Sequence, residues 1–286
     1  MSISRQNFSV IIVSFKSDHV IHHCINSISK DIEILVIDNS NDLEFKKNIE
    51  EKYENVKCIL SSKNLGMGAG NNLGIKNVNK DYAFILNPDV TLQDDTIDEI
   101  IMASNNIDTF GIISPISDKT KYPNYKIFNN DNQNFDPIQP FKVKSVDGYA
   151  MFLNLKRLKQ IDGFNFFDEN FFLYLENDDL CENLSKIKEN IYIVPKAKVN
   201  HLGGEAVNPK YKMEIELSRN WHWMWSKFYF NKKHFGFTKA FIKILGNLIS
   251  SNIKFIYYLL TLKNYKRKIY QMRLSGLLSS IIGRKS

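Results

Sequence analysis

The alternation of short apolar runs with amphipathic stretches is the feature that most limits the folds open to this chain. Residues 8–15 and 32–38 are β-branched apolar runs, and an amphipathic stretch at 18–30 lies between them. Two further apolar runs follow at 56–60 and 82–86. This order predicts an α/β fold with a mostly parallel, doubly wound sheet.

The polar residues that follow these runs indicate where a ligand binds. Parallel sheets bind ligands beyond the carboxyl ends of their strands. Ser14, Asp38 and Asn64 lie at or just after three of the runs, and Asn87-Pro88-Asp89 follows the fourth. We therefore expect these side chains to line one crevice.

Charge is distributed unevenly along the chain, which predicts two regions with different tasks. Residues 206–286 contain 16 Lys and Arg but only two Glu, a net charge of +14, whereas the 22 basic and 29 acidic residues of 1–205 give −7. With 286 residues and 43% hydrophobic side chains, the chain is long enough for a full α/β core and an appended region. We expect a ligand-binding domain at 1–205 and a basic, mainly helical region at 206–286. Within the first of these regions, the Asn- and Pro-rich residues 117–142 predict an irregular surface segment.

Cysteine use and the N-terminal sequence both predict the cytoplasm. The three cysteines are odd in number and are not spaced as metal pairs, so neither a disulfide framework nor a zinc ribbon is expected. The N-terminal residues lack the charged start and small-residue cleavage site of a signal peptide.

The tripeptide Asn87-Pro88-Asp89 is the strongest single indication of a metal site. An aspartate fixed in a dry crevice after a rigid proline is costly without a partner, and a divalent cation would be one. Oxygen ligands at a strand end suit Mg²⁺ or Mn²⁺, which neutralise a diphosphate leaving group. The alternative is a turn in which Asp89 caps a helix beginning near Asp94.

Three other signals each allow two interpretations. The glycines of 66–70 miss the spacing of the dinucleotide and Walker motifs, so their loop is either a ligand cradle or a structural turn. The carboxylates of 176–179 favour a general base through crowding of like charges, but a helix N-terminus has the same composition. His201 is either a metal ligand or an ordinary histidine.

Taken together and in this order, the motifs resemble those of the inverting glycosyltransferases of family 2, and most closely the rhamnosyltransferase-like branch. The resemblance implies a GT-A fold, a Rossmann-like nucleotide-sugar-binding catalytic domain at 1–205, and a metal-dependent hexosyltransferase. The matching segments are SVIIVSF, VIDNSN, NLGMGAGNNLGI, ILNPDV, VDGYAMFLNLKRL, GFNFFDENFFLYLENDDLC and HLGGEA, which span residues 9–206.

The resemblance also implies a role for each matched position. Asn87-Pro-Asp89 takes the place of the family's Asp-x-Asp, so Asp89 is the expected ligand of Mg²⁺ or Mn²⁺, completed by His201. The donor nucleotide is assigned to Ser14, Asp38, Asn64, Gly66 and Asn87, and the donor sugar and acceptor to Asp147, Gly148 and Asp168.

One departure from the family pattern concerns the catalytic base. Related sequences usually have Glu-Asp-x-Asp-Leu-Cys-x-Arg, whereas this chain has Glu-Asn-Asp-Asp-Leu-Cys-Glu-Asn from residue 176. The second position is commonly the base, and the amide of Asn177 cannot take up a proton. We expect Glu176, or after it Asp178, to act instead; a nucleotide-sugar-binding protein with little activity is the alternative.

The C-terminal region combines aromatic residues and lysines with two apolar stretches, at 240–262 and 269–282. Charges such as Lys243 and Lys254 inside the first stretch disfavour a membrane span. We expect interfacial helices on the anionic inner face of the cell membrane. Packing on a partner or in a homodimer is the alternative, and no nucleic-acid partner is expected because no recognised motif accompanies the basic residues.

These observations lead to one predicted reaction. A single displacement would move L-rhamnose from dTDP-rhamnose to a polyprenyl-linked or cell-surface polysaccharide acceptor, with inversion at the anomeric carbon. The runner-up donor is a UDP-sugar, either galactofuranose or an N-acetylhexosamine.

Overall fold

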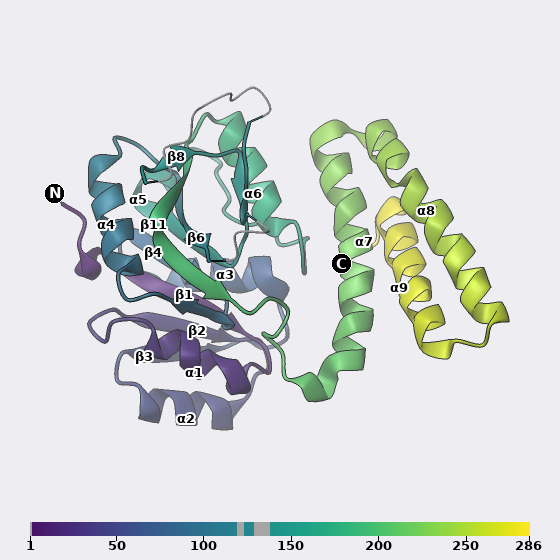
Figure 1. The fold of residues 1–286 in the computed structure, drawn as a ribbon, viewed down its shortest axis with the longest axis horizontal. Helices are drawn as coiled ribbons and strands as arrows, with labels where there is room; N and C mark the ends of the chain where they lie inside the picture. Colours follow the sequence, from purple (N-terminus) through teal and green to yellow (C-terminus); the bar gives the residue numbers. More distant parts are fainter. Residues whose placement is uncertain (1, 119–122, 129–137) are drawn as a thin grey trace. The chain divides into compact units, whose positions relative to one another are not determined.

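The chain forms two compact units, each described here by itself (Figure 1). The computed structural model describes residues 2–118, 123–128 and 138–286, so half of the expected irregular segment at 117–142 lies outside the described residues. The α/β unit comprises Met1–Leu65, Ala69–Phe167 and Asn177–Asn208. The helical unit comprises Gly66–Gly68, Asp168–Glu176 and Pro209–Ser286, so it contains two short segments that lie before residue 205. The division of function between 1–205 and 206–286 remains a prediction.

A mixed, mostly parallel sheet forms the centre of the α/β unit, which confirms the predicted fold class. Among the described residues it runs in the order β3-β2-β1-β4-β10-β6-β11-β5, with β8 paired to β11. β1 is parallel to β2 and β4, whereas β10 and β5 run antiparallel to their neighbours. The strands are β1 (Phe8–Ser14), β2 (Ile34–Asp38), β3 (Val56–Leu60), β4 (Tyr82–Leu86), β5 (Val90–Leu92), β6 (Ile112–Ser117), β8 (Phe141–Lys142), β10 (Ala150–Asn154) and β11 (Ile191–His201); β7 (Tyr125–Lys126) pairs with β9 (Ser145–Val146) in a small second sheet.

Helices cover both faces of the sheet, which explains why every residue of β1 is buried. Val10 and Ile12 share a core with Cys24 of α1 on one face. On the other face α3 lies so close that a Cβ on Gly74 would be 2.5 Å from Ile11. The helices of the α/β region are α1 (Asp18–Asn26), α2 (Leu43–Lys52), α3 (Gly66–Asn77), α4 (Thr96–Asn106), α5 (Leu155–Leu158) and α6 (Glu176–Lys186).

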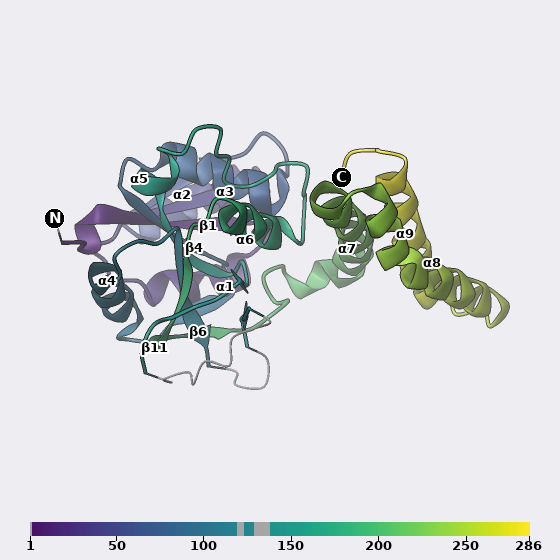
Figure 2. The same cartoon turned by 90° about the horizontal axis from the view of Figure 1, so that it is seen from above.

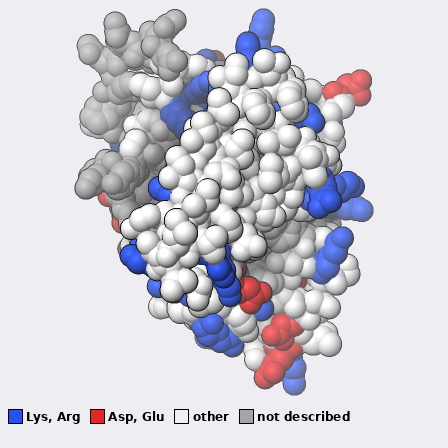
Figure 3. Space-filling view, turned by 90° about the vertical axis from the view of Figure 1, so that its right-hand side faces the viewer, with Lys and Arg blue, Asp and Glu red and all other residues white. Residues whose placement is uncertain are grey.

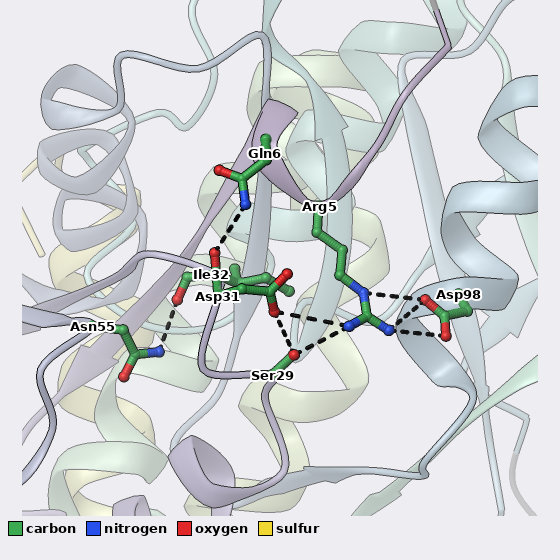
Figure 4. Close-up of polar contacts among 7 residues, drawn as sticks. All are labelled: Arg5, Gln6, Ser29, Asp31, Ile32, Asn55 and Asp98. Carbon is green, nitrogen blue, oxygen red and sulfur yellow. Dashed lines mark hydrogen bonds and ion pairs between the residues drawn. The ribbon is translucent and has the colours of Figure 1, made fainter.

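A polar cluster around Arg5 joins the segments that precede the first strands (Figure 4). The Arg5 guanidinium donates to the Asp98 carboxylate over 2.7 Å and 2.9 Å and to the Ser29 hydroxyl over 3.2 Å. The Asn55 side chain donates to the Ile32 carbonyl over 2.8 Å, just before β3 and β2 begin. These contacts hold the segments at the amino ends of β1, β2 and β3 together. They lie at the opposite edge of the sheet from the polar residues that follow the strands.

The C-terminal part of the helical unit contains three helices that lie side by side (Figure 2). They are α7 (Lys212–Phe235), α8 (Phe237–Leu260) and α9 (Asn264–Ile281), which confirms a mainly helical C-terminal region. Met224, Phe228, Ile244 and Leu277 form a small core between them. None of the described helices is both long and apolar enough to cross a membrane.

Candidate functional site

The structure brings three of the predicted residues to one edge of the sheet. β1 and β2 are in parallel register with Ser14 opposite Asp38, and β4 lies on the other side of β1. Both side chains are buried, and so is Asp89 beyond the end of β4. Asn64 lies half-buried in the loop after β3. The parallel order of β3, β2, β1 and β4 therefore brings these side chains to the carboxyl edge of the sheet. That they line one crevice stays a prediction.

Asp38 is buried against the turn that follows β2. Its carboxylate accepts hydrogen bonds from the backbone N–H groups of Ser40, over 3.1 Å, and Asp42, over 2.9 Å. Burial nevertheless raises the pKa of Asp38, since desolvation outweighs these two bonds. The ends of β1 and β2 are joined by the Asn39 N–H, which donates to the Ser14 carbonyl over 2.8 Å. Asp38 is thus held rigidly at the position expected for a ribose contact.

Asp89 and His201 form a pair in the α/β unit. The Asp89 side chain is 1% exposed, and its Oδ1 lies 3.4 Å from Nε2 of His201. Within the described part of the chain, neither carboxylate oxygen of Asp89 accepts a hydrogen bond. The pairing follows from the β5–β11 ladder, in which His201 is opposite Val90. The Tyr149 ring stacks on the imidazole with 4.1 Å between centroids and so fixes its orientation.

The structure shows that Asp89 is not a helix cap. α4 begins at Thr96 with Asp95 as its N-cap, and β5 lies between Asp89 and that helix. The alternative interpretation of Asn87-Pro88-Asp89 as a capping turn is therefore wrong, and the buried carboxylate needs another explanation.

Further unsatisfied polar atoms accompany Asp89. Over the described residues, the Ser14 hydroxyl, the Asn87 side-chain carbonyl and the Asn71 side-chain carbonyl are buried without a hydrogen-bond partner. Buried polar groups are almost always paired, so the atoms of Ser14 and Asn87 at strand ends indicate that a ligand supplies the partner. Asn71 lies within α3, in the glycine-rich segment, and was not predicted as a site residue.

The donor set of Asp89 and His201 fits a divalent cation bound together with a phosphate ligand. No group of three or more His, Cys, Asp or Glu side chains with metal-site geometry is found among the described residues. Mg²⁺ usually takes one or two carboxylates and completes its shell with substrate phosphates and water. Asp89 would supply one such carboxylate, and His201 would add a nitrogen ligand.

The segment that contains Asp147 and Gly148 packs against the start of α6. Asn177 donates to the Val146 carbonyl over 2.9 Å, and a Cβ on Gly148 would lie 3.0 Å from the Asn177 Cβ. Burial, and then the nearby Asp178 carboxylate, raise the pKa of Asp147. Asn177 thus has a structural role that an aspartate, which is an acceptor only, cannot perform.

The remaining acidic side chains of α6 differ in their surroundings. Asp178 forms an ion pair with Lys126 over 2.6 Å. Asp179 is fully buried and accepts a hydrogen bond from Asn183 over 3.3 Å. Glu176 is the first residue of α6, and the two residues before it, Tyr174 and Leu175, have φ values of 71° and 66°. Strain of this kind costs of order 1–3 kcal/mol per residue and is concentrated at functional sites.

Residues 168–176, which we call the strap, belong to the helical unit and pack on α7. Phe171 is fully buried against Trp225 and Tyr229, and the Ser226 hydroxyl donates to the Leu173 carbonyl over 2.9 Å. Phe172 stacks on His222, whose pKa burial lowers to about 4. The Phe172 carbonyl accepts from the Met67 N–H over 2.9 Å, and a Cβ on Gly66 would lie 2.1 Å from it. Gly66 therefore has a steric reason to be glycine besides its predicted nucleotide role.

Asp168 anchors the strap to α7. Its carboxylate accepts hydrogen bonds from Tyr229 over 2.9 Å and from Lys233 over 2.8 Å, as well as from Asn170. Burial acts to raise the pKa of Asp168, but the bonds from Lys233 and Asn170 outweigh it and the pKa is lowered. These α7 partners lie more than 60 residues from Asp168 in the sequence, so no local pattern could indicate them.

The substitution Asp168→Asn is expected to destabilise the helical unit by about 1–3 kcal/mol at neutral pH, because it removes a charged acceptor. Since the folded pKa is lowered, this stabilisation is present above the unfolded value near 3.8 and is lost as the pH falls below it. All three tryptophans lie in α7, so urea unfolding followed by fluorescence at pH 7 and pH 3 measures the effect. Exposed Asp162→Asn is the control, and an equal deficit at both pH values would contradict the ion-pair explanation.

The fold defines a GT-A protein whose candidate site lies at the carboxyl edge of its sheet. Solved structures share it: GalNAc-T7 with UDP, GalNAc and Mn²⁺ has a TM-score of 0.57 at 13% identity, over 85% of this chain and 57% of that one. The mannosyltransferase PcManGT from Pyrobaculum calidifontis with GDP-Man and Mn²⁺ has a TM-score of 0.56 at 11% identity, over 96% and 87%. TarS residues 1–349 from S. aureus has 0.50 at 14% identity, over 97% and 92%. At these identities the likeness establishes the fold alone.

The sequence comparisons then give the family. The profile of glycosyl transferase family 2 matches residues 9–158, and the chain belongs to this family. The low-salt glycan biosynthesis hexosyltransferase Agl10 of Haloferax volcanii is 29% identical over 203 residues, which are 65% of this chain. The chain matches 64% of the length of that relative.

Proposed function

We propose that this protein is an inverting, metal-dependent hexosyltransferase that moves a sugar from a nucleotide donor to an acceptor hydroxyl. The observation that carries the proposal is the buried, unsatisfied Asp89 carboxylate beside His201, at the sheet edge where a GT-A fold binds its donor. Mn²⁺ in two structures of the same fold and a relative named as a hexosyltransferase support it.

The residues of this chain divide the work among them. Asp89 and His201 would hold Mg²⁺ or Mn²⁺, which when bound neutralises the charge of the nucleoside diphosphate leaving group. Asp38 accepts hydrogen bonds from the ribose. The side-chain oxygens of Ser14 and Asn87, which lack a partner among the described residues, form hydrogen bonds with the nucleotide. Glu176 takes the proton of the attacking hydroxyl.

The donor and acceptor are the finer parts of the proposal. The resemblance to the rhamnosyltransferase-like branch favours dTDP-rhamnose as donor, ahead of UDP-galactofuranose or a UDP-N-acetylhexosamine. The acceptor is a polyprenyl-linked or polysaccharide glycan at the inner face of the membrane. The ten Lys and Arg and the absence of Asp and Glu in residues 237–286 support an acceptor held at an anionic surface.

A calorimetric donor screen tests the proposal. dTDP-rhamnose, UDP-sugars and GDP-mannose are titrated into the protein with Mn²⁺, with Mg²⁺ and with chelator. One donor is expected to bind tightly, and only when the cation is present. If none of these nucleotide sugars binds under any condition, the proposed function is wrong; metal-linked binding without turnover on any acceptor would favour a binding protein.

A further inference from the structure

One face of α8 exposes an apolar stripe that no other part of the helical unit covers. Its members recur every three or four residues, the spacing that places them along one side of a helix. Their exposed fractions range from 42% for Leu245 to 77% for Leu260. The opposite side of α8 is buried in the unit's core through Ala240 and Ile244. The stripe consists of Ile242, Leu245, Ile249, Ile253, Ile256 and Leu260.

The second apolar stretch of the sequence forms no such stripe. Gly276, Leu277 and Ser280 of α9 are buried, and a Cβ on Gly276 would lie 2.2 Å from the Trp221 carbonyl of α7. α9 is therefore the inner helix that supports α7 and α8. Of the two stretches predicted to form interfacial helices, only the one in α8 therefore keeps an exposed apolar face.

Basic residues border the stripe. Lys239 and Lys243 lie in the first two turns of α8, and the turn after the helix is followed by exposed lysines such as Lys263 and Lys266. α8 and α9 contain no Asp or Glu. Figure 3 shows a broad uncharged surface with Lys and Arg at its margins and acidic groups only toward its upper right and lower edges.

We propose that the α8 stripe docks in the plane of an anionic lipid surface, with its isoleucines and leucines at the headgroup boundary and the bordering lysines on lipid phosphates. An anionic bilayer supplies both the apolar layer and the complementary charge. A second copy of the chain would oppose one lysine border to another, and like charges in contact are unfavourable. The inference deepens the proposed function, because it identifies the surface that brings the enzyme to a membrane-held acceptor.

Vesicle sedimentation of the full chain tests the inference. The two probes are vesicles of phosphatidylcholine alone and vesicles of equal parts phosphatidylglycerol and phosphatidylcholine. We expect binding to the anionic vesicles that salt weakens. Ile249→Gln/Ile253→Gln should lower that binding by at least about tenfold. Lys239→Gln/Lys263→Gln should lower it by about thirtyfold, at roughly fivefold for each basic residue.

The control is Leu43→Gln, which removes a leucine that is 73% exposed on α2 of the α/β unit and should leave vesicle binding unchanged. Equal binding to both vesicle types, or binding that survives both α8 variants, would overturn the inference. The inference would also be wrong if the native chain were a dimer in solution, the Ile249→Gln/Ile253→Gln variant were a monomer, and neither protein bound vesicles. Donor titrations on the same samples separate the two proposals, since a native chain that binds the donor but not the anionic vesicles defeats only this one.

Discussion

Replacing Asp89 with alanine is expected to lower the rate of sugar transfer by more than about 10²-fold, because second-shell changes at metal sites already cost about 10- to 100-fold. The melting temperature in chelator should stay level or rise. The native carboxylate is buried and accepts no hydrogen bond among the described residues, and its ion pair with His201 spans 3.4 Å, so the substitution removes a polar group whose burial is only partly compensated. Most substitutions of a buried residue lower stability, whereas this one is expected to lower activity and to keep or raise stability.

Three measurements on the Asp89 variant check the prediction: turnover at saturating donor, Mn²⁺ affinity by calorimetry, and thermal unfolding in chelator. Asn87→Ala is the matched comparison, two residues away and also buried at its side-chain oxygen, and should have the milder effect. Normal turnover of Asp89→Ala in chelator, or an unchanged Mn²⁺ affinity, would show that this carboxylate is not a metal ligand.

Glu176→Gln is expected to reduce transfer by about 10²-fold or more while leaving donor affinity nearly unchanged, since the amide keeps size and polarity but cannot take up a proton. Steady-state rates and donor titrations measure the two effects separately. Asp178→Asn should cost less, because Asp178 is already engaged in the ion pair with Lys126.

The neighbouring Asn177→Asp variant restores the usual family residue, and the structure changes the expected result. Asn177 donates to the Val146 carbonyl over 2.9 Å, and an aspartate would oppose two acceptors there. We therefore expect no gain in rate unless Gly148 and its loop shift. Normal rates in both Glu176→Gln and Asp178→Asn would exclude this motif as the source of the base and require a double-displacement or substrate-assisted route.

The parts of the fold that depend on local sequence were predictable. The runs at 56–60 and 82–86 coincide with β3 and β4, and the polar residues after them lie at the carboxyl edge as expected. The β5–β11 ladder was not predictable, because it pairs residues about a hundred positions apart and no local pattern specifies that register. The proximity of His201 to Asp89, which depends on this ladder, was therefore expected only from the family resemblance.

The packing partners of α7 could not be predicted for a related reason. Aromatic residues mixed with lysines have the same pattern whether they contact lipid or another part of the chain, and composition does not identify the partner. In the structure Trp225 is 3% exposed, and it packs on Phe171 of the strap. Residues 164–174 and 221–229 are both rich in aromatic residues, but their mutual contact is a long-range feature that no local pattern specifies.

The attachment of the strap to α7 has a consequence for how such an enzyme can be modified or evolve. Glu176 ends a segment in which Phe171 packs on α7, the Leu173 carbonyl accepts from Ser226 and the Asp168 carboxylate accepts from Tyr229 and Lys233. By its contacts, the segment that ends at Glu176 therefore belongs with the C-terminal helices. Exchanging or trimming the C-terminal helices to retarget the protein would also remove the support of its proposed base, so changes in location and changes in chemistry are constrained to occur together.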